Sequence, residues 1–381
     1  MEGGYLVNHS FQTCILSPSI PCSDKKQSLQ KKQISKLVFH PKSSQSTNKE
    51  LKANQYIQKI PSHKKWSLTF HTKCKPPFYE LLNKYDPSGM KQCIQKTYPI
   101  DDFDVVKFNE NSQMLLGTKG DTNLLTYFSL RFKSITPKKL PYEFLTLMKT
   151  MKPIFQAISE LETHNLIHND IKSDNIVLHN NSFKLIDFEL TDKVSKPKVF
   201  QERSLQEFYN NRLYFVYPLD YLFYSVIDEE IQQEIVSIYK RKHCDDYISI
   251  HNSFQRDTLT SINNVIETLL QESIPYRKII KKIDVYSLGI IIPYLFLKFS
   301  SIKKPHKQDV MISDFYNLFS LMTDPLSNSR ISSKKSYQLF TSLLEKYKMY
   351  SPTNITKKSR RRSTRRRSTR RRSTRRRSII S

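Results

Sequence analysis

Hydrophobic positions follow a regular period most clearly between residues 144 and 161. Apolar side chains recur there at helical spacing, which predicts one long amphipathic helix, and Pro153 predicts a bend within it. We expect the apolar stripe to lie in the core rather than on a binding face. Its members are Phe144, Leu147, Met148, Met151, Ile154, Phe155, Ile158 and Leu161.

Two short apolar runs come soon after this helix. Asn175–Leu178 and Phe183–Ile186 flank a polar stretch at 179–182, a pattern that is typical of a β-hairpin. Polar residues precede the first run and another follows the second, so the hairpin brings their side chains to one edge. They are His168, Asp170, Lys172, Asn175 and Asp187.

Transfer of a phosphoryl group from ATP needs such a set of side chains. One carboxylate must accept the proton of a substrate hydroxyl, and a cation must stabilise the charge on the transferred group. The candidates for these catalytic roles are Asp170 and Lys172. An amide oxygen and a second carboxylate hold Mg²⁺ (or Mn²⁺) against the phosphates, and Asn175 and Asp187 are the candidates for metal and cofactor binding.

The segments that carry this chemistry resemble two motifs of the protein kinase family. Residues 168–175, HNDIKSDN, are similar to the catalytic loop H-R-D-x-K-x-x-N, and residues 187–189, DFE, are similar to D-F-G. Lys172 resembles the lysine of the serine/threonine class. Asn169 departs from the usual Arg, which binds a phosphate on the activation loop, and Glu189 replaces the glycine, which removes a flexible hinge.

Three later segments resemble kinase motifs in the expected order. Residues 214–220, 283–290 and 321–331 are similar to the A-P-E, D-x-W-S-L-G and D-P-x-x-R segments. The resemblance implies that the acid of the first segment pairs with the Arg of the third, and that the Asp of the second braces the catalytic loop. These structural residues are Asp220, Arg330 and Asp284, together with His168.

The nucleotide-binding residues of the small lobe are less clearly marked. Phe103–Phe108 predicts a strand that carries Lys107, and Gly89 lies upstream as the one glycine available for a phosphate-covering turn. We expect Lys107 to contact the α and β phosphates because it alone combines an apolar strand with an upstream glycine. Lys96 and Lys73 remain rival candidates, and the glutamate that pairs with this lysine in the family stays unassigned.

Charge divides the chain into a body of small net charge and two basic ends. Of the net charge of +27, residues 1–75 contribute thirteen Lys against three acids, and residues 357–377 contribute twelve Arg and two Lys with no acid. This pattern predicts a basic, largely flexible N-terminal extension at 1–75. The other expected parts are a kinase N-lobe at 76–130, a C-lobe at 131–350 with an insertion around 225–280, and a disordered Arg-rich tail at 351–381.

The tail repeats RRRST with a period of five residues. It has no apolar period, and its arginines favour binding of polyanions, including nucleic acid, by counterion release. We expect residues 357–378 to make this contact. The Ser and Thr residues follow arginines directly, so phosphorylation would offset the positive charge and could act as an electrostatic switch.

The five cysteines are odd in number, scattered and without a C-x-x-C spacing. They predict neither a disulfide framework nor a zinc site, which favours a reducing, intracellular compartment such as the cytoplasm or nucleus of a host cell. The N-terminus lacks the pattern of a secretory signal, so we expect the protein not to be secreted. The most apolar run, Leu288–Phe299, contains Pro293 and is too short to cross a bilayer, so no membrane partner is expected.

Together these features predict a serine/threonine protein kinase with an α+β, bilobal fold: a reduced N-terminal β lobe and a mainly helical C-terminal lobe. Its expected cofactors are ATP and Mg²⁺ (or Mn²⁺), and its expected partners are basic protein substrates. The compact small lobe, the two motif departures and the tail resemble kinases of large DNA viruses, of baculovirus or poxvirus type. Two alternatives stay open: a catalytically weak pseudokinase scaffold, and a nucleic-acid-packaging protein with a kinase-like anchor domain.

Overall fold

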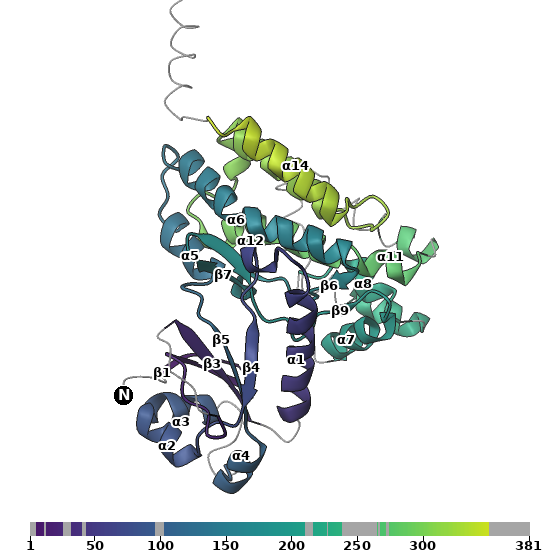
Figure 1. Cartoon of the computed structure of the whole chain (residues 1–381). Coiled ribbons are helices and arrows are strands. Elements are labelled where there is room, and N and C mark those ends of the chain that lie inside the picture. Colours follow the sequence, from purple (N-terminus) through teal and green to yellow (C-terminus); the bar gives the residue numbers. More distant parts are fainter. Residues whose placement is uncertain are drawn as a thin grey trace, which may run out of the picture.

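A computed structural model gives the fold of the chain for residues 5–10, 13–25, 32–39, 43–95, 103–209, 216–226, 228–237, 265, 267–271 and 274–349. These residues form two lobes, one built on a five-stranded sheet and one mainly helical (Figure 1). The predicted α+β, bilobal fold is therefore confirmed.

The N-terminal lobe is built on an antiparallel sheet with strand order β1-β2-β3-β5-β4. Because side chains alternate across a strand, the buried Leu16 and Cys14 of β2 share one face of the sheet with Leu37 of β3. Lys36 points to the opposite face, beside its register partner Leu115 of β5. The strands are β1 (Tyr5–Ser10), β2 (Thr13–Ser17), β3 (Gln33–Val38), β4 (Phe70–Cys74) and β5 (Gln113–Thr118).

Helix α1 (Ser43–Gln58) follows β3 and packs against β4 and β5 (Figure 1). Its C-terminal part buries Ala53 and Ile57 in the main hydrophobic core. Its N-terminal part instead buries polar side chains, among them Glu50. A buried carboxylate needs a cationic partner to offset its lost hydration, so this half of the helix depends on polar contacts.

The prediction that residues 1–75 form a flexible extension is wrong for the described residues. Strands β1 to β4 and helix α1 all lie between residues 5 and 74, so the N-terminal lobe spans 5–118 rather than 76–130. The strands are five or six residues long, and α1 consists largely of Ser, Gln, Asn and Lys. Composition therefore hides the few buried positions, which are covered by strands and helices distant in the sequence, among them β5.

Three helices between β4 and β5 pack on the face of the sheet that carries Leu37, since their buried side chains share one hydrophobic cluster with it. Each contributes a buried apolar side chain to that face, as Leu82, Met90 and Phe108 do. The helices are α2 (Tyr79–Tyr85), α3 (Pro87–Gln95) and α4 (Val105–Asn111).

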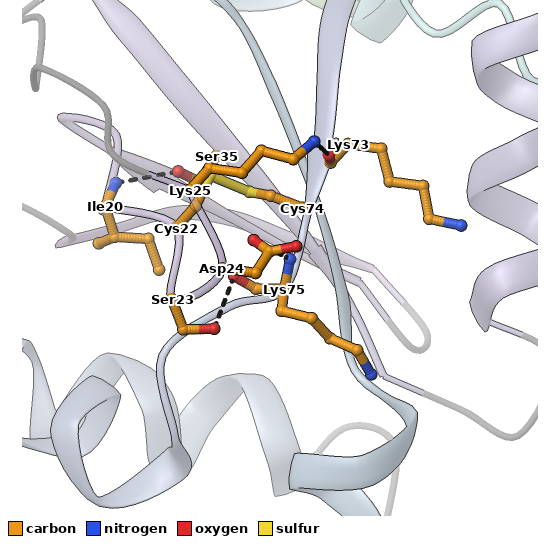
Figure 2. The surroundings of a disulfide bond; sticks show 9 residues. All are labelled: Ile20, Cys22, Ser23, Asp24, Lys25, Ser35, Lys73, Cys74 and Lys75. Carbon is orange, nitrogen blue, oxygen red and sulfur yellow. Dashed lines mark hydrogen bonds between the residues drawn. A yellow bond between two sulfur atoms is a disulfide. The ribbon is translucent and has the colours of Figure 1, made fainter.

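The four cysteines in the described part of the chain form two disulfides, so the prediction against a disulfide framework is wrong. Cys14 of β2 pairs with Cys93 of α3, and Cys22 pairs with Cys74 of β4, with Cα–Cα distances of 6.0 and 5.8 Å. Figure 2 shows the second pair, which ties the chain after β2 to the end of β4. The partners lie 79 and 52 residues apart, so no local spacing reveals them. The argument for a reducing compartment, which rested on the cysteine pattern, loses its basis.

The C-terminal lobe packs its helices around α6 (Leu140–Thr163) and α12 (Ile283–Phe299), and α14 (Ser333–Lys346) lies along α6 (Figure 1). All eight apolar residues of the predicted stripe are buried in α6, so that prediction is confirmed. Among the described residues, none of the helices combines the length and the apolar character needed to cross a membrane. The other helices are α5 (Leu124–Phe132), α7 (Pro197–Tyr209), α8 (Leu219–Phe223), α11 (Tyr276–Ile280) and α13 (Val310–Met322).

The predicted hairpin is present as β7 (Ile176–His179) and β8 (Ser182–Leu185). Its turn residues Asn180 and Asn181 have φ values of 50° and 60°. Asn tolerates this left-handed conformation, which two-residue hairpin turns of the right twist require. Local sequence therefore determines both the strands and the turn.

The insertion predicted around 225–280 lies partly outside the described residues. Residues 229–237 are helical, residues 238–264 are not described, and α11 leads into α12. The whole predicted tail at 351–381 also lies outside the described residues.

Candidate active site

The loop between β6 (Leu166–Ile167) and β7 brings three of the predicted residues into contact. Lys172 Nζ lies 2.9 Å from Asp170 Oδ2, and Asn175 Nδ2 donates to Asp170 Oδ2 (2.7 Å) and to its main-chain oxygen (2.9 Å). The Asp170 carboxylate is therefore oriented from two sides. Burial raises its pKa, with Lys172 acting in the opposite direction, which makes it a better proton acceptor than an exposed Asp.

A buried carboxylate from helix α12 holds the backbone of this loop. Asp284 Oδ2 accepts a hydrogen bond from His168 N (2.7 Å), and Oδ1 accepts one from Asn169 N (3.0 Å). The His168 ring nitrogen Nε2 lies 3.2 Å from the main-chain oxygen of Ile186, and the ring packs 5.0 Å from that of Phe188. His168 therefore links the catalytic loop to both neighbours of the D-F-E aspartate.

Two residues of the site adopt a left-handed backbone conformation, Asn169 with φ of 61° and Asp187 with φ of 62°. Such values are uncommon for residues with a Cβ, and Asn and Asp tolerate them best. Asp187 Oδ1 then lies 3.4 Å from Lys36 Nζ of strand β3, in the other lobe. Conformations of this kind concentrate at functional sites, where surrounding contacts maintain them.

Lys36 of β3 and Glu50 of α1 form a buried ion pair that sequence reasoning missed. Nζ and Oε2 lie 2.9 Å apart, and the two side chains are 8% and 1% exposed. Burial alone would lower the pKa of Lys36, but Asp187 and the other nearby carboxylates outweigh it and raise this pKa. Burial also raises the pKa of Glu50 to about 7, against the opposing effect of Lys36.

The prediction of a strand that places Lys107 at the nucleotide is wrong. Lys107 lies on helix α4 rather than on a strand, its side chain is 78% exposed, and its Nζ lies 3.5 Å from Asp104. The Asp104 side chain caps α4 by accepting hydrogen bonds from two backbone N–H groups. This cap starts a helix in a V-V-K-F run whose composition predicts a strand.

Gly89 does not form a phosphate-covering turn either. It lies buried inside helix α3, where an added side chain would collide with that of Asp86. Of the rival lysines, Lys73 lies at the exposed edge of β4 with Nζ 2.8 Å from the Asn48 side chain. Lys96 lies outside the described residues.

Two sequence features could have identified the Lys36–Glu50 pair. Lys36 stands alone as a charged residue in ISKLVF, an otherwise apolar strand pattern. Glu50 precedes Ala53 and Ile57 by three and seven residues, the spacing of one helix face. The polar composition of residues 43–52 hid this short stripe.

The oxygen donors of the site fit a divalent metal ion. Burial alone would raise the pKa of Asp187, but the charges of Lys36 and Lys172 outweigh it and lower this pKa, which keeps the carboxylate ionised. The Asn175 amide nitrogen is engaged by Asp170, which leaves its amide oxygen for a metal. Hard oxygen ligands of this kind suit Mg²⁺ or Mn²⁺.

Asp220 and Arg330 form the ion pair that the motifs predict. Arg330 Nη2 lies 3.1 and 3.2 Å from the two carboxylate oxygens, and both side chains are fully buried. The Arg330 guanidinium also packs over the ring of Tyr286 on α12. The pair joins helix α8 to the segment that precedes α14.

We expect Asp220→Asn to lower the free energy of unfolding by about 3–5 kcal/mol, because it leaves the buried Arg330 without its counterion. Urea denaturation followed by circular dichroism measures the change. Asp314→Asn is the matched control, since its partner Lys346 is 59% exposed and loss of that pair should cost less than about 1 kcal/mol. Equal effects of the two substitutions would contradict the structural role of Asp220.

Comparison with known proteins agrees with this geometry. Residues 103–214 match the family model described as the protein kinase domain. A protein of Acanthamoeba polyphaga mimivirus, whose name assigns it provisionally as a serine/threonine-protein kinase, is 47% identical over 45 residues. The alignment covers 12% of this chain and 16% of the relative, so the chain matches only a small part of that protein's length.

The matched segment contains the catalytic loop, the hairpin and the D-F-E motif, whereas Lys36 and Glu50 lie outside it. The structure brings these two residues to Asp187 nevertheless. Together with the bilobal fold and the order of the motifs, these matches show a segment at residues 103–214 that is similar to the protein kinase domain and support a divergent kinase.

Proposed function

We propose that the protein is a serine/threonine protein kinase that transfers the γ-phosphate of ATP to protein substrates with the help of Mg²⁺ or Mn²⁺. The observation that carries this proposal is the ion pair between the lobes: Lys36, held by Glu50 at 2.9 Å, lies 3.4 Å from Asp187. This arrangement offers a cation for nucleotide phosphates directly beside oxygen ligands for their metal ion.

Each residue then has a defined task in the transfer. Asp170 accepts the proton of the Ser or Thr hydroxyl and orients its oxygen, and Lys172 offsets charge on the transferred group. Lys36 holds the α and β phosphates. A metal ion bound by Asp187 and Asn175 would neutralise the remaining phosphate charge.

The pH dependence of the reaction should report the buried carboxyl groups. The raised pKa values of Glu50, at about 7, and of Asp170 mean that both groups take up protons nearer to neutral pH than ordinary carboxyls. Protonated Glu50 no longer holds Lys36, and protonated Asp170 cannot accept the substrate proton. We therefore expect kcat/KM for Mg·ATP to fall as the pH drops through about 7, since this parameter reports the free enzyme.

A pH–rate profile of wild type and of Glu50→Gln checks this expectation. The variant should be slower throughout, and its remaining acid limb should shift to lower pH because only Asp170 still titrates there. A wild-type profile that stays flat until the pH range of an exposed Asp or Glu would contradict the expectation.

The test of the proposed activity is a phosphate-transfer assay with the purified full-length chain, γ-labelled ATP and Mg²⁺ or Mn²⁺. A basic protein such as histone and an acidic one such as casein serve as substrates. We expect label on Ser and Thr, more on the basic protein, and at least about 100-fold slower transfer with Asp170→Asn. If wild type transfers no more phosphate than Asp170→Asn, the proposed kinase activity is rejected and the pseudokinase scaffold remains.

We also propose that the Arg-rich residues 357–378 bind polyanions such as nucleic acid. Twelve arginines without an acid support non-specific, salt-dependent binding. Full-length protein should bind DNA of unrelated sequences equally, with affinity that falls steeply with salt, and deletion of residues 357–381 should remove most of this salt dependence. Unchanged binding after the deletion would reject the proposal.

A further inference from the structure

Glu189 makes a contact between the lobes that the catalytic motifs do not explain. Its Oε1 accepts a hydrogen bond from Ser46 Oγ of helix α1 at 2.8 Å, and its Oε2 lies 3.8 Å from Lys36 Nζ. A glycine, as in D-F-G, offers no side chain for either contact. The D-F-E segment therefore holds the N-terminal lobe through two successive carboxylates, those of Asp187 and Glu189.

The contact falls on the part of α1 that has the least apolar anchoring. Ala53 and Ile57 hold the C-terminal part of the helix in the main core, whereas the buried residues of its first two turns are all polar. Ser46 and Glu50 are four residues apart and lie on one face of the helix. A hydrogen bond that fixes Ser46 therefore also fixes the rotation of α1 that brings Glu50 to Lys36.

The activation segment is the stretch between the D-F-E motif and the A-P-E-like residues 214–220. Two tyrosine hydrogen bonds hold its C-terminal end. Tyr217 Oη donates to the main-chain oxygen of Asn169 at 2.7 Å. Asn169 stands in place of the Arg that binds a phosphate on the activation loop in the kinase motif. Tyr221 Oη donates to the main-chain oxygen of Phe200 in helix α7 at 2.9 Å. Tyrosine hydroxyls thus tie this segment to the catalytic loop and to its own first helix without a phosphate group.

We propose that Glu189 is a positioning residue that clamps helix α1 to the metal-binding segment and keeps the Lys36–Glu50 pair formed without phosphorylation of residues 190–216. The inference rests on the proposed function, because it states how that same site is held ready for Mg·ATP. Glu189 acts through α1 and Lys36 rather than on the reacting atoms.

Hydrogen–deuterium exchange of residues 43–50 in the nucleotide-free, full-length protein tests the clamp without catalysis. Glu189→Ala should speed this exchange by about tenfold, as expected for loss of one charge-assisted hydrogen bond. Ser46→Ala should have a similar effect, and the double variant should add little to Glu189→Ala, because both single changes remove the same hydrogen bond between Ser46 and Glu189. Glu189→Gln keeps an acceptor for Ser46 and should restore most of the protection.

Gln45→Ala is the matched control, since Gln45 is an exposed neighbour on the same helix turn and should leave exchange unchanged. Kinetics give a second readout with protein freed of phosphate by a phosphatase. Wild type should keep its kcat and KM for Mg·ATP after this treatment. Glu189→Ala should raise KM about tenfold with little change in kcat, because nucleotide binding selects the clamped form.

Unchanged exchange of residues 43–50 in Glu189→Ala would overturn the proposal. A higher Mg²⁺ requirement with unchanged exchange would overturn it as well and make Glu189 a metal ligand instead. Loss of wild-type activity on phosphatase treatment would show that the site needs phosphorylation, against the clamp. If wild type transfers no phosphate at all, the proposed function fails, and the exchange of α1 still decides whether Glu189 clamps the helix.

Discussion

Replacing Lys36 by Met is expected to lower kcat/KM for Mg·ATP by about 10²- to 10³-fold, the cost of removing one preorganised charge from a phosphoryl-transfer site. Lys36 is the buried cation between Glu50 (2.9 Å) and Asp187 (3.4 Å), where nucleotide phosphates would meet the metal ligands. Met keeps a long apolar stem in the same space and removes only the ammonium group. Initial rates at varied ATP concentration measure the loss.

Lys107→Met is the matched control for this prediction. Lys107 is exposed on α4, and such a surface substitution should change kcat/KM by less than about twofold. Circular dichroism of both variants separates loss of activity from loss of fold. An equal loss in the two variants, or a larger one in Lys107→Met, would return the nucleotide-binding role to Lys107.

Asp170→Asn is expected to lower kcat by about 10²- to 10⁴-fold, the usual contribution of a positioned general base. The carboxylate is held by Lys172 at 2.9 Å and by Asn175 at 2.7 Å, and burial raises its pKa, so it is prepared to accept a proton. Asn keeps the shape of the side chain but cannot take the proton. KM for ATP should change little, because Asp170 is not among the residues proposed to bind nucleotide.

Single-turnover kinetics separate these two parameters. Asp314→Asn on helix α13 serves as the control, because its carboxylate pairs with an exposed lysine of α14 outside the active site. If Asp170→Asn leaves kcat unchanged, general-base catalysis by the Asp170 carboxylate is excluded. A raised KM with unchanged kcat would instead make Asp170 a ligand of the nucleotide complex.

The C-terminal half of the site could be predicted because its chemistry is encoded in short contiguous motifs. The loop and hairpin from His168 to Asp187 contain their own turn residues, strand patterns and functional groups, so local rules are sufficient. The buried pair of Asp220 and Arg330 lies 110 residues apart, and only the resemblance of the flanking motifs to a known family connected the two.

The N-terminal half could not be predicted because its determinants are distributed. Lys36 stands in a short strand and Glu50 in a largely polar helix, and their burial depends on contacts with strand β5, which helices α2 to α4 separate from β4 along the chain. Lys107 was chosen from a local apolar run, but the cap at Asp104 makes that run a helix. The disulfides likewise join cysteines 79 and 52 residues apart, a distance at which spacing gives no information.

The most direct test of the proposed site is a crystal structure of the full-length protein with Mn²⁺ and a non-hydrolysable ATP analogue, with the metal located by anomalous scattering. We predict a Mn²⁺ peak bonded to carboxylate oxygen of Asp187 and the amide oxygen of Asn175, with Lys36 Nζ on the α and β phosphates. A nucleotide ordered elsewhere, or a metal ion held without Asp187, would contradict a kinase site built from these residues.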